Sequence, residues 1–327
     1  MELKILRRKR VLISGATGFI GANLVRKCLE AEAKVHIITR TTSNKWRIKD
    51  ALEDINEHCV DLLDYEKLEA LLFKAKPEII FHTATYGGYP YQKDVDNIIQ
   101  TNIIGTVNLL NACLKVGFNI FVNTGSSSEY GVKSKPANEV DLLEPNNNYG
   151  VVKASATLFC QAKARSEKLP IITLRLFSPY GYYEEATRLV PSVIISCLRE
   201  KNPKVSSPEP VRDFVFIGDV LDAYVKAANI PSIGGEIFNI GYSQQHSVGE
   251  VVNKIIELTG GRVSPEWGCI PKRANEPTVW QADISKAKNI LKWKPKHILE
   301  EGLNKTVKWF EENLFLYKEV INQEFKL

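Results

Sequence analysis

Short apolar runs alternate with longer amphipathic stretches through the first half of the chain. Parallel strands that are buried on both faces of a sheet need such near-continuous apolar runs. The residues between the runs repeat at helical spacing, as in successive βαβ units. The pattern therefore predicts an α/β fold with a doubly wound parallel sheet. The expected strands are Val11 to Ser14, Lys34 to Thr39, Glu57 to Val60, Ile79 to His82, Ile120 to Asn123 and Ile171 to Leu176.

Two predicted helices are long and carry more apolar surface than one face of a sheet requires. They run from about Val95 to Val116 and from about Tyr149 to Lys168. A helix-to-helix contact in a homodimer would use this surplus, and so would deep burial within one chain. The first interpretation predicts a homodimer. A third amphipathic pattern predicts a terminal helix over Leu303 to Phe315.

The regular alternation ends after Pro179, where short apolar runs mix with proline-containing loops. We therefore expect a dinucleotide-binding domain over residues 1–178. A smaller mixed α/β lobe for the substrate is expected over residues 179–327, with some of the chain crossing back to the first domain.

Composition excludes several classes of function. A formal net charge of +5, spread evenly, is too weak to indicate a nucleic-acid partner. No apolar stretch is long enough to span a bilayer and no signal peptide is evident, so we expect no membrane association and a cytoplasmic location. The six cysteines lie far apart and are expected to be reduced core thiols. The histidines are scattered, so no metal site is expected.

The first predicted strand leads directly into a glycine-rich turn, Gly15-Ala16-Thr17-Gly18-Phe19-Ile20-Gly21, which is followed by a helix. Glycines at these positions permit a tight turn, a close approach of backbone N–H groups to a pyrophosphate, and tight packing of helix on strand. A strand, this turn and a helix in that order are typical of a Rossmann-type dinucleotide site.

A second motif lies in the helix that starts near residue 149. Tyr149 and Lys153 are four residues apart and share one helical face. A neighbouring ammonium favours the phenolate form of tyrosine, which suits it to proton transfer. The segment Thr124 to Gly131, which includes Ser126, lies at the end of the fifth strand and provides hydroxyl groups that can hold the reacting oxygen. The three residues predict a catalytic trio.

With these motifs the chain resembles the NAD-dependent epimerase/dehydratase group of extended short-chain dehydrogenases over nearly its whole length. The resemblance implies that Tyr149 is the general acid/base, that Lys153 also holds the nicotinamide ribose, and that Ser126 binds the sugar oxygen. It further implies a nucleoside-diphosphate sugar as the substrate. Further matching segments are Asp61-Leu62, Asn102-x-x-Gly105-Thr106, Leu174 to Gly181, Val211 to Val220, Phe238 to Gly241 and Ala282 to Ala287.

The resemblance also implies contacts with both ligands. Expected cofactor contacts are Gly15, Thr17, Gly18, Phe19, Ile20, Gly21, Arg40, Asp61, Leu62, Ala84, Asn102, Tyr149, Lys153 and Phe177. Expected substrate contacts are Tyr86, Ser178, Arg212 and Arg273. Guanidinium groups suit the diphosphate, although Arg212 could instead pair with Asp213 at the surface. Ser178 stands where many relatives have an asparagine.

The end of the second strand departs from the pattern for NAD. An acidic residue there usually binds the ribose hydroxyls, whereas this chain has Thr39 followed by Arg40. NADP(H) is therefore favoured, and NAD(H) stays possible if Arg40 stacks beside the adenine.

The nature of the reaction depends on the residues after Ser126. Dehydratases of the family place acids there, whereas this chain has Ser127 and Ser128, which argues against dehydration. Glu129 is expected to point away from Ser128 by strand alternation. An NADPH-dependent 4-ketoreductase acting on a 4-keto-6-deoxysugar is favoured, and an NAD-dependent 4-epimerase is the alternative. A non-catalytic NADP-binding sensor is a remote alternative, because it has little need of the trio.

A loop rich in glycine and tyrosine, Thr85 to Tyr91, follows the fourth strand. It opens at the carboxyl end of the sheet, where ligands of this fold bind. Tyr86 or Tyr89 is therefore a candidate sugar contact, with packing on the second lobe as the other interpretation.

Overall fold

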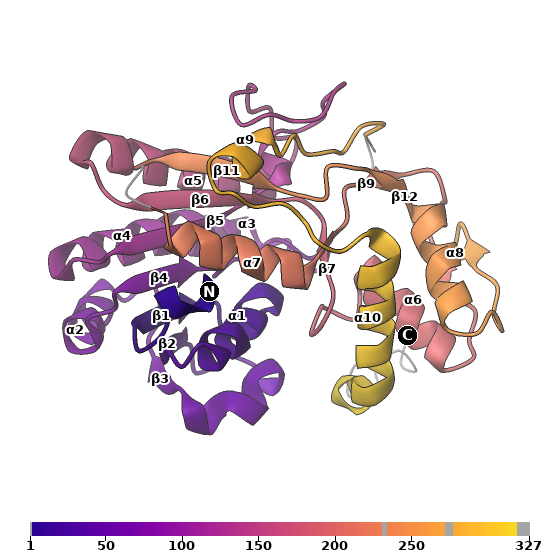
Figure 1. Cartoon of the computed structure of the whole chain (residues 1–327), viewed down its shortest axis with the longest axis horizontal. Helices are drawn as coiled ribbons and strands as arrows, with labels where there is room; N and C mark the ends of the chain where they lie inside the picture. The colour runs from indigo at the N-terminus through magenta and orange to yellow at the C-terminus, as the bar shows by residue number, and fades with distance from the viewer. Residues whose placement is uncertain (1, 231–233, 272–276, 319–327) are drawn as a thin grey trace.

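The computed structural model describes residues 2–230, 234–271 and 277–318. A seven-stranded parallel sheet forms its centre, in the order β11-β6-β5-β4-β1-β2-β3 (Figure 1). The fold is the Rossmann-type doubly wound α/β fold that the hydrophobic pattern predicts. The strands are β1 Arg10–Ser14, β2 Lys34–Thr39, β3 Asn56–Cys59, β4 Ile79–His82, β5 Ile120–Ser126, β6 Ile171–Leu176 and β11 Glu236–Ile240.

Four of these strands differ from the sequence-based expectation, and the first of them, β1, begins one residue earlier, at Arg10. β3 begins and ends one residue earlier, and β5 continues to Ser126 because its last residues stay paired with β6 as far as Leu176. The seventh strand, β11, pairs with β6 although it lies in the part of the chain expected to form the second lobe.

Helices cover both faces of the sheet. On one face lie α2 Tyr65–Ala75, α4 Gly105–Val116 and α5 Asn148–Glu167, whose buried side chains form one apolar cluster with the strands. On the other face lie α1 Phe19–Glu30 and α7 Ile217–Ala228, which belong to the larger cluster. Burial of both faces explains the apolar runs of the inner strands, whereas the edge strand β3 is polar and mostly exposed.

The long helix expected over residues 95–116 is interrupted. It consists of α3 Val95–Ile99, a π-helical turn η3 over Gln100–Ile104, and α4. At this turn the buried Asn102 amide donates to the carbonyls of Ile98 and Tyr86, at 2.7 Å each. π-Turns inside helices occur frequently at functional sites, and this one ties the helix to the loop after β4.

The second lobe packs against the carboxyl ends of the strands and appears on the right of Figure 1. Its helices α6 Leu189–Leu198, α8 Val248–Leu258 and α10 Leu299–Asn313 contact one another. Three pairs of two-residue strands connect its loops: β7 Pro179–Tyr180 with β10 Val215–Phe216, β8 Lys204–Val205 with β13 Glu266–Trp267, and β9 Val211–Arg212 with β12 His246–Ser247.

The shorter elements complete the described chain. They are the 3₁₀ helices η1 Glu2–Ile5, η2 Trp46–Asp54, η4 Ser127–Glu129 and η5 Leu314–Tyr317, and the short helix α9 Ser285–Asn289. No helix in the described ranges combines the length and the apolar character needed to cross a membrane. Four cysteines are buried thiols, but Cys59 and Cys269 are exposed, contrary to the expectation of core positions.

Candidate active site

The glycine turn between β1 and α1 has the shape that a pyrophosphate site needs. Gly15 has φ +72°, and a Cβ there would lie 2.5 Å from the Ala84 nitrogen. A Cβ on Gly21 would lie 2.2 Å from the Gly15 carbonyl oxygen. Gly18 caps α1, and no described side chain bonds to this helix end. The turn therefore leaves the positive end of α1 open to an anion. Thr17, Phe19 and Ile20, also expected cofactor contacts, lie in the same turn and first helical residues.

The end of β2 carries a cluster of charged groups. The Thr39 hydroxyl donates to Glu57 Oε1 at 2.5 Å, and Lys45 pairs with the same oxygen. The hydrogen bond from Lys45, followed by that from Thr39, lowers the pKa of Glu57. Arg40 is exposed, and its backbone N–H donates to Ser43 Oγ at 2.8 Å. Lys45 pairs with Glu57, and the exposed Arg40 adds a further positive charge at this edge.

The expected adenine contacts lie at the end of β3. Asp61 is exposed and accepts a hydrogen bond from the Leu63 N–H at 3.0 Å, while the neighbouring Leu62 is buried. Asn102, by contrast, is fully occupied within the protein, because its Oδ1 also accepts from the Thr85 hydroxyl at 2.7 Å. Asn102 therefore shapes the loop beside the cofactor site.

Ser126 occupies the point where β5 turns into η4. Its Oγ accepts a hydrogen bond from the Ser128 N–H at 3.1 Å, and its own N–H donates to Glu129 Oε1 at 2.7 Å. These two bonds form a capping box around the turn. In its bond with the Ser128 N–H, the Ser126 Oγ acts only as an acceptor. A hydroxyl can accept and donate at the same time, so its proton can still be donated to another group.

Helix α5 brings Tyr149 and Lys153 to this turn. Asn147 caps the start of the helix, and its side chain accepts from the Gly150 N–H at 2.8 Å. A Cβ on Gly150 would lie 2.5 Å from the Ser128 carbonyl oxygen, so the start of α5 packs directly on the Ser126 turn. Tyr149 is half-buried and Lys153 is 5% exposed. The structure thus places the start of α5, which carries Tyr149 and Lys153, against the turn that contains Ser126.

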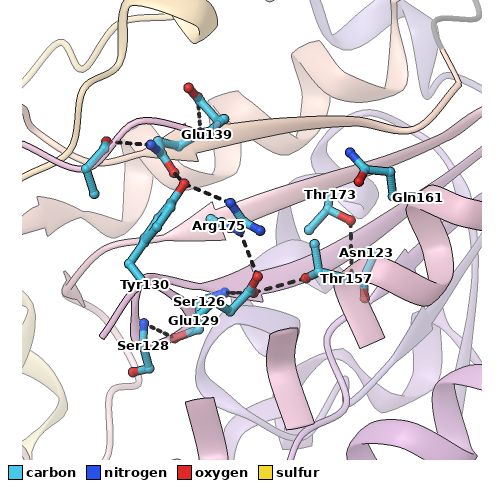
Figure 2. Close-up of polar contacts among 12 residues, drawn as sticks. Asn123, Ser126, Ser128, Glu129, Tyr130, Glu139, Thr157, Gln161, Thr173 and Arg175 are labelled. Carbon is cyan, nitrogen blue, oxygen red and sulfur yellow. Dashed lines mark hydrogen bonds and ion pairs between the residues drawn. The ribbon is translucent and has the colours of Figure 1, made fainter. Parts of the chain in front are cut away.

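We expected Glu129 to point away from Ser128 because side chains alternate along a strand. That reasoning was wrong, because Glu129 does not lie on a strand. The residue belongs to η4 and is fully buried. Its carboxylate accepts hydrogen bonds from Ser126, Thr157 and Arg175 (Figure 2). Burial raises the pKa of Glu129, and the Arg175 guanidinium opposes this shift. All three partners are donors, an environment that fits the carboxylate form.

The loop after β4 lies against the trio. A Cβ on Gly88 would lie 3.9 Å from the Tyr149 hydroxyl, and Arg188 donates to the Gly88 carbonyl at 2.6 Å. The Tyr89 ring stacks on Tyr91 and lies 5.0 Å from the Arg188 guanidinium, and burial raises its pKa to about 12. Tyr86 is half-buried. The loop packs on the second lobe and also borders Tyr149, and the contact of Tyr86 or Tyr89 with a sugar stays a prediction.

The expected substrate contacts come from different parts of the chain: Tyr86 from the loop after β4, Ser178 from the segment after β6, and Arg212 from the second lobe. Arg212 is half-buried in β9, with its guanidinium 5.5 Å from the Trp280 ring. Asp213 is buried, and its carboxylate accepts from the backbone N–H groups of Tyr242, Ser243 and Ala282. The Ser178 carbonyl accepts from the Val215 N–H at 3.1 Å. Arg273 lies outside the described residues.

A small pocket lies between the segment that follows Ser126 and this lobe, and none of the trio residues lines it. It is lined by Ser127 and Phe177 from the first domain and by Trp280 among others from the second. Phe177 itself is 2% exposed. In the described ranges, no group of three or more His, Cys, Asp or Glu side chains is placed to bind a metal ion.

Arg175 has a structural role beside the site that the sequence alone did not predict. A charged residue within the apolar run of a strand buried on both faces requires a buried partner of opposite charge. The segment Leu174-Arg175-Leu176 places such a charge in an apolar run and so indicates a buried partner. The identity of that partner depends on tertiary structure and cannot be read from the sequence. The network of Figure 2 supplies it as Glu129.

The parallel sheet, the glycine turn and the assembled Ser126, Tyr149 and Lys153 define a short-chain dehydrogenase/reductase. The model of the NAD dependent epimerase/dehydratase family matches residues 11–241. The chain belongs to this family, whose members are NAD(P)-dependent enzymes acting on nucleotide sugars.

Three known proteins illustrate the similarity. UDP-glucuronic acid decarboxylase 1 of Danio rerio is 27% identical, over 94% of this chain and 74% of its own. The crystal structure of UDP-glucose 4-epimerase with UDP-glucose from Thermotoga maritima has a TM-score of 0.86 and 28% identity, covering 93% of this chain and 99% of its own. UDP-glucuronic acid 4-epimerase from Bacillus cereus, in complex with UDP-glucuronic acid and NAD, has a TM-score of 0.82 and 27% identity, with the same coverage.

Proposed function

We propose that the protein reduces a nucleoside-diphosphate 4-keto-6-deoxysugar at C4 with NADPH. The observation that carries this proposal is the end of β2, where Thr39 and the exposed Arg40 stand in place of an acidic residue and Lys45 neutralises Glu57. A positive edge suits a 2′-phosphate, whereas an acid would repel it. NADPH is consumed in a single reduction, as this reaction requires.

The residues at the turn favour hydride transfer at C4 over dehydration. Ser127 and Ser128 follow Ser126, and Glu129 is held by its buried donors away from any ligand role. Elimination of water needs an acid and a base beside the sugar. The two serines supply neither.

The trio has a direct part in the proposed reaction. Bound NADPH supplies the hydride that reaches C4. Ser126 donates its free hydroxyl proton as a hydrogen bond to the 4-keto oxygen, and Tyr149 donates a proton to that oxygen as the alcohol forms. Lys153, on the same face of α5, favours the tyrosinate that remains.

The second lobe completes the substrate site in this proposal. Arg212 and Arg273 bind the diphosphate, Ser178 lies beside a substrate phosphate, and Tyr86 borders the sugar. The glycine turn, Ala84, Asp61, Leu62 and Phe177 surround the cofactor, while Asn102 holds the loop between the two. The domain boundary near residue 178 then separates the cofactor half of the site from most of the substrate half.

A second candidate reaction is NAD-dependent 4-epimerisation. The similarity to a UDP-glucose 4-epimerase and to a UDP-glucuronic acid 4-epimerase with NAD favours it. The same trio would serve, because an epimerase removes and returns hydride at C4. The two reactions differ in what happens to the cofactor: the epimerase would regenerate NAD+, whereas the reductase would consume NADPH.

Absorbance at 340 nm separates the two reactions. The purified protein is mixed with NADPH or NADH and a panel of nucleoside-diphosphate 4-keto-6-deoxysugars, and any copurified cofactor is identified by mass. Stoichiometric NADPH loss with one donor supports the reductase and identifies its nucleotide. No loss, together with retained NAD, contradicts it and directs the test to epimerisation. A Tyr149→Phe variant that binds cofactor without turnover excludes the non-catalytic sensor.

We also propose that the protein is a cytoplasmic homodimer. Support comes from apolar side chains that remain exposed on the adjacent helical segments α3, η3 and α5. They are Val95, Ile99, Ile104, Val151 and Leu158, each 38–49% exposed.

A further inference from the structure

The strongest feature that the proposed function leaves unexplained is a buried ion pair directly behind Ser126. Glu129 and Arg175 have side-chain exposures of 0% and 1%, and their closest atoms are 2.7 Å apart. Removing two charges from water offsets most of their attraction, so a buried ion pair is a poor source of stability. Its position beside the catalytic turn indicates a different role.

The Glu129 carboxylate joins three elements (Figure 2). Oε1 accepts from the Ser126 N–H at the end of β5, at 2.7 Å, and from the Thr157 hydroxyl on α5, at 3.0 Å. Oε2 accepts from Arg175 Nε on β6 at 2.7 Å. One carboxylate therefore connects the residue that binds the sugar oxygen to the helix that carries the other two members of the trio.

The spacing along α5 makes this connection specific. Thr157 lies one helical turn after Lys153 and two turns after Tyr149, on the same face. A bond at Thr157 thus sets the position of that face relative to the Ser126 turn. Lys153 is close enough for its charge to act on Glu129.

Contacts on two sides restrict the position of the Glu129 carboxylate. A Cβ on Gly125 would be 2.7 Å from Glu129 Oε1, so the chain has a glycine where the carboxylate needs space. On the other side, Arg175 Nη1 donates to the Tyr130 hydroxyl at 2.9 Å, and that hydroxyl donates to Asn239 Oδ1 at 2.7 Å. The guanidinium is fixed by these bonds and in turn fixes Glu129.

We propose that Glu129, held by Arg175, is a positioning residue that locks the Ser126 turn to helix α5 and thereby sets Ser126 relative to Tyr149 and Lys153. This inference rests on the proposed use of the trio in hydride transfer at C4. It assigns Glu129 no contact with substrate.

The test compares substitutions that differ by one bond. Thr157→Val removes only the hydroxyl that reaches Glu129, and Thr157→Ser keeps it. Since a displacement of about 1 Å can cost about 100-fold in rate, we expect kcat to fall roughly 10-fold to 100-fold in Thr157→Val and in Glu129→Gln. KM and bound cofactor stay within about twofold, and Thr157→Ser retains most of the wild-type kcat.

A matched control separates positioning from general stability. Asp219 is also a buried carboxylate, 1% exposed, and it accepts from the backbone N–H groups of Lys296 and His297 in the second lobe. Asp219→Asn is expected to lower the melting temperature while kcat is unchanged. An unchanged kcat in folded Thr157→Val and Glu129→Gln overturns the inference, as does an equal kcat loss in Asp219→Asn.

A second readout does not depend on turnover. Amide hydrogen exchange at Ser126, whose N–H donates to Glu129, is expected to be at least 10-fold faster in Glu129→Gln than in wild type, with exchange in β1 unchanged. Unchanged exchange at Ser126 contradicts the inference even if the enzyme proves inactive on every sugar tried. Wild-type inactivity with faster exchange in the variant instead contradicts the proposed function alone.

Discussion

Arg40 is the residue on which the proposed choice of cofactor depends. Its guanidinium is exposed at the end of β2, beside the neutralised Glu57. A charge-assisted hydrogen bond contributes about 1.5–3 kcal/mol, so Arg40→Ala should raise the KM for NADPH by about 10-fold to 100-fold and leave that for NADH nearly unchanged. Steady-state kinetics with both cofactors measure this. Arg262→Ala, at an exposed arginine paired with Glu200, serves as the control. Equal effects on both cofactors would argue that Arg40 stacks on the adenine.

Glu184 is a buried acid whose titration should affect stability. Its exposure is 7%, and burial raises its pKa from 4.5 to about 8. Between these values the folded protein holds a proton that the unfolded chain has lost. The free energy of unfolding should therefore fall as the pH rises through this window, by about 1.4 kcal/mol per pH unit from this group.

The isosteric substitution Glu184→Gln isolates this contribution. The variant cannot ionise, so its free energy of unfolding should decline less between pH 5 and about 8 than that of the wild type. Urea denaturation at pH 5.5 and pH 8 measures both slopes. Parallel slopes in the two proteins would show that Glu184 is ionised in the folded state.

At the scale of elements, the contact between α5 and the Ser126 turn depends on Gly150. A Cβ there would lie 2.5 Å from the Ser128 carbonyl oxygen, which belongs to backbone and can yield only if the turn or the helix moves. Gly150→Ala should therefore separate Tyr149 from Ser126 and lower kcat by about 100-fold.

Gly249 provides the matched comparison for this substitution. It is a buried glycine near the start of α8, where a Cβ would lie 2.9 Å from Pro208 Cβ, far along the second lobe. Gly249→Ala should reduce the melting temperature and leave kcat unchanged. If both alanine variants lose stability and neither loses kcat, the close packing of α5 on the turn has no catalytic role.

Some helices, strands and turns of this fold could be predicted from the sequence and others could not. The strands β1, β2, β4, β5 and β6 could be located because burial on both faces requires apolar runs, whereas β3 is polar and mostly exposed and its bounds were missed by one residue. The glycine turn could be located because its close contacts admit no side chain. The end of β5 could not, because η4 depends on a capping box whose acceptor, Glu129, is fixed by Arg175 on another strand. The resemblance to the family identified Ser126, Tyr149 and Lys153 as a catalytic trio. The contacts of Glu129 and Arg175 beside Ser126 could not be predicted, because they depend on the tertiary structure.

At the scale of the whole molecule, β11 shows the limit of dividing the chain by residue number. It follows the first part of the second lobe in sequence yet pairs with β6, and Asn239 within it accepts from the Tyr130 hydroxyl. The same strand leads into the loop at Tyr242, whose N–H donates to Asp213 beside Arg212. The two halves of the site are thus joined by a strand of the sheet itself, which favours a fixed arrangement of the cofactor and substrate sides.

The surface of α3, η3 and α5 leads to the last prediction. Ile99 and Leu158, 38% and 49% exposed, lie on adjacent helical segments and fit an apolar contact between two copies. Light scattering after gel filtration should give about twice the chain mass of 36.8 kDa for the wild type. The double substitution Ile99→Glu and Leu158→Glu should reduce it to one chain mass, because burying two like charges at a shared contact is unfavourable.

Val140 offers the control for this experiment, because it is 90% exposed on a loop outside the three segments. Val140→Glu should leave the measured mass at two chains. A wild-type protein with the mass of one chain would contradict the dimer directly. A double variant that keeps two chains would place the contact on another face, and the exposed apolar residues of α5 would then need a different partner.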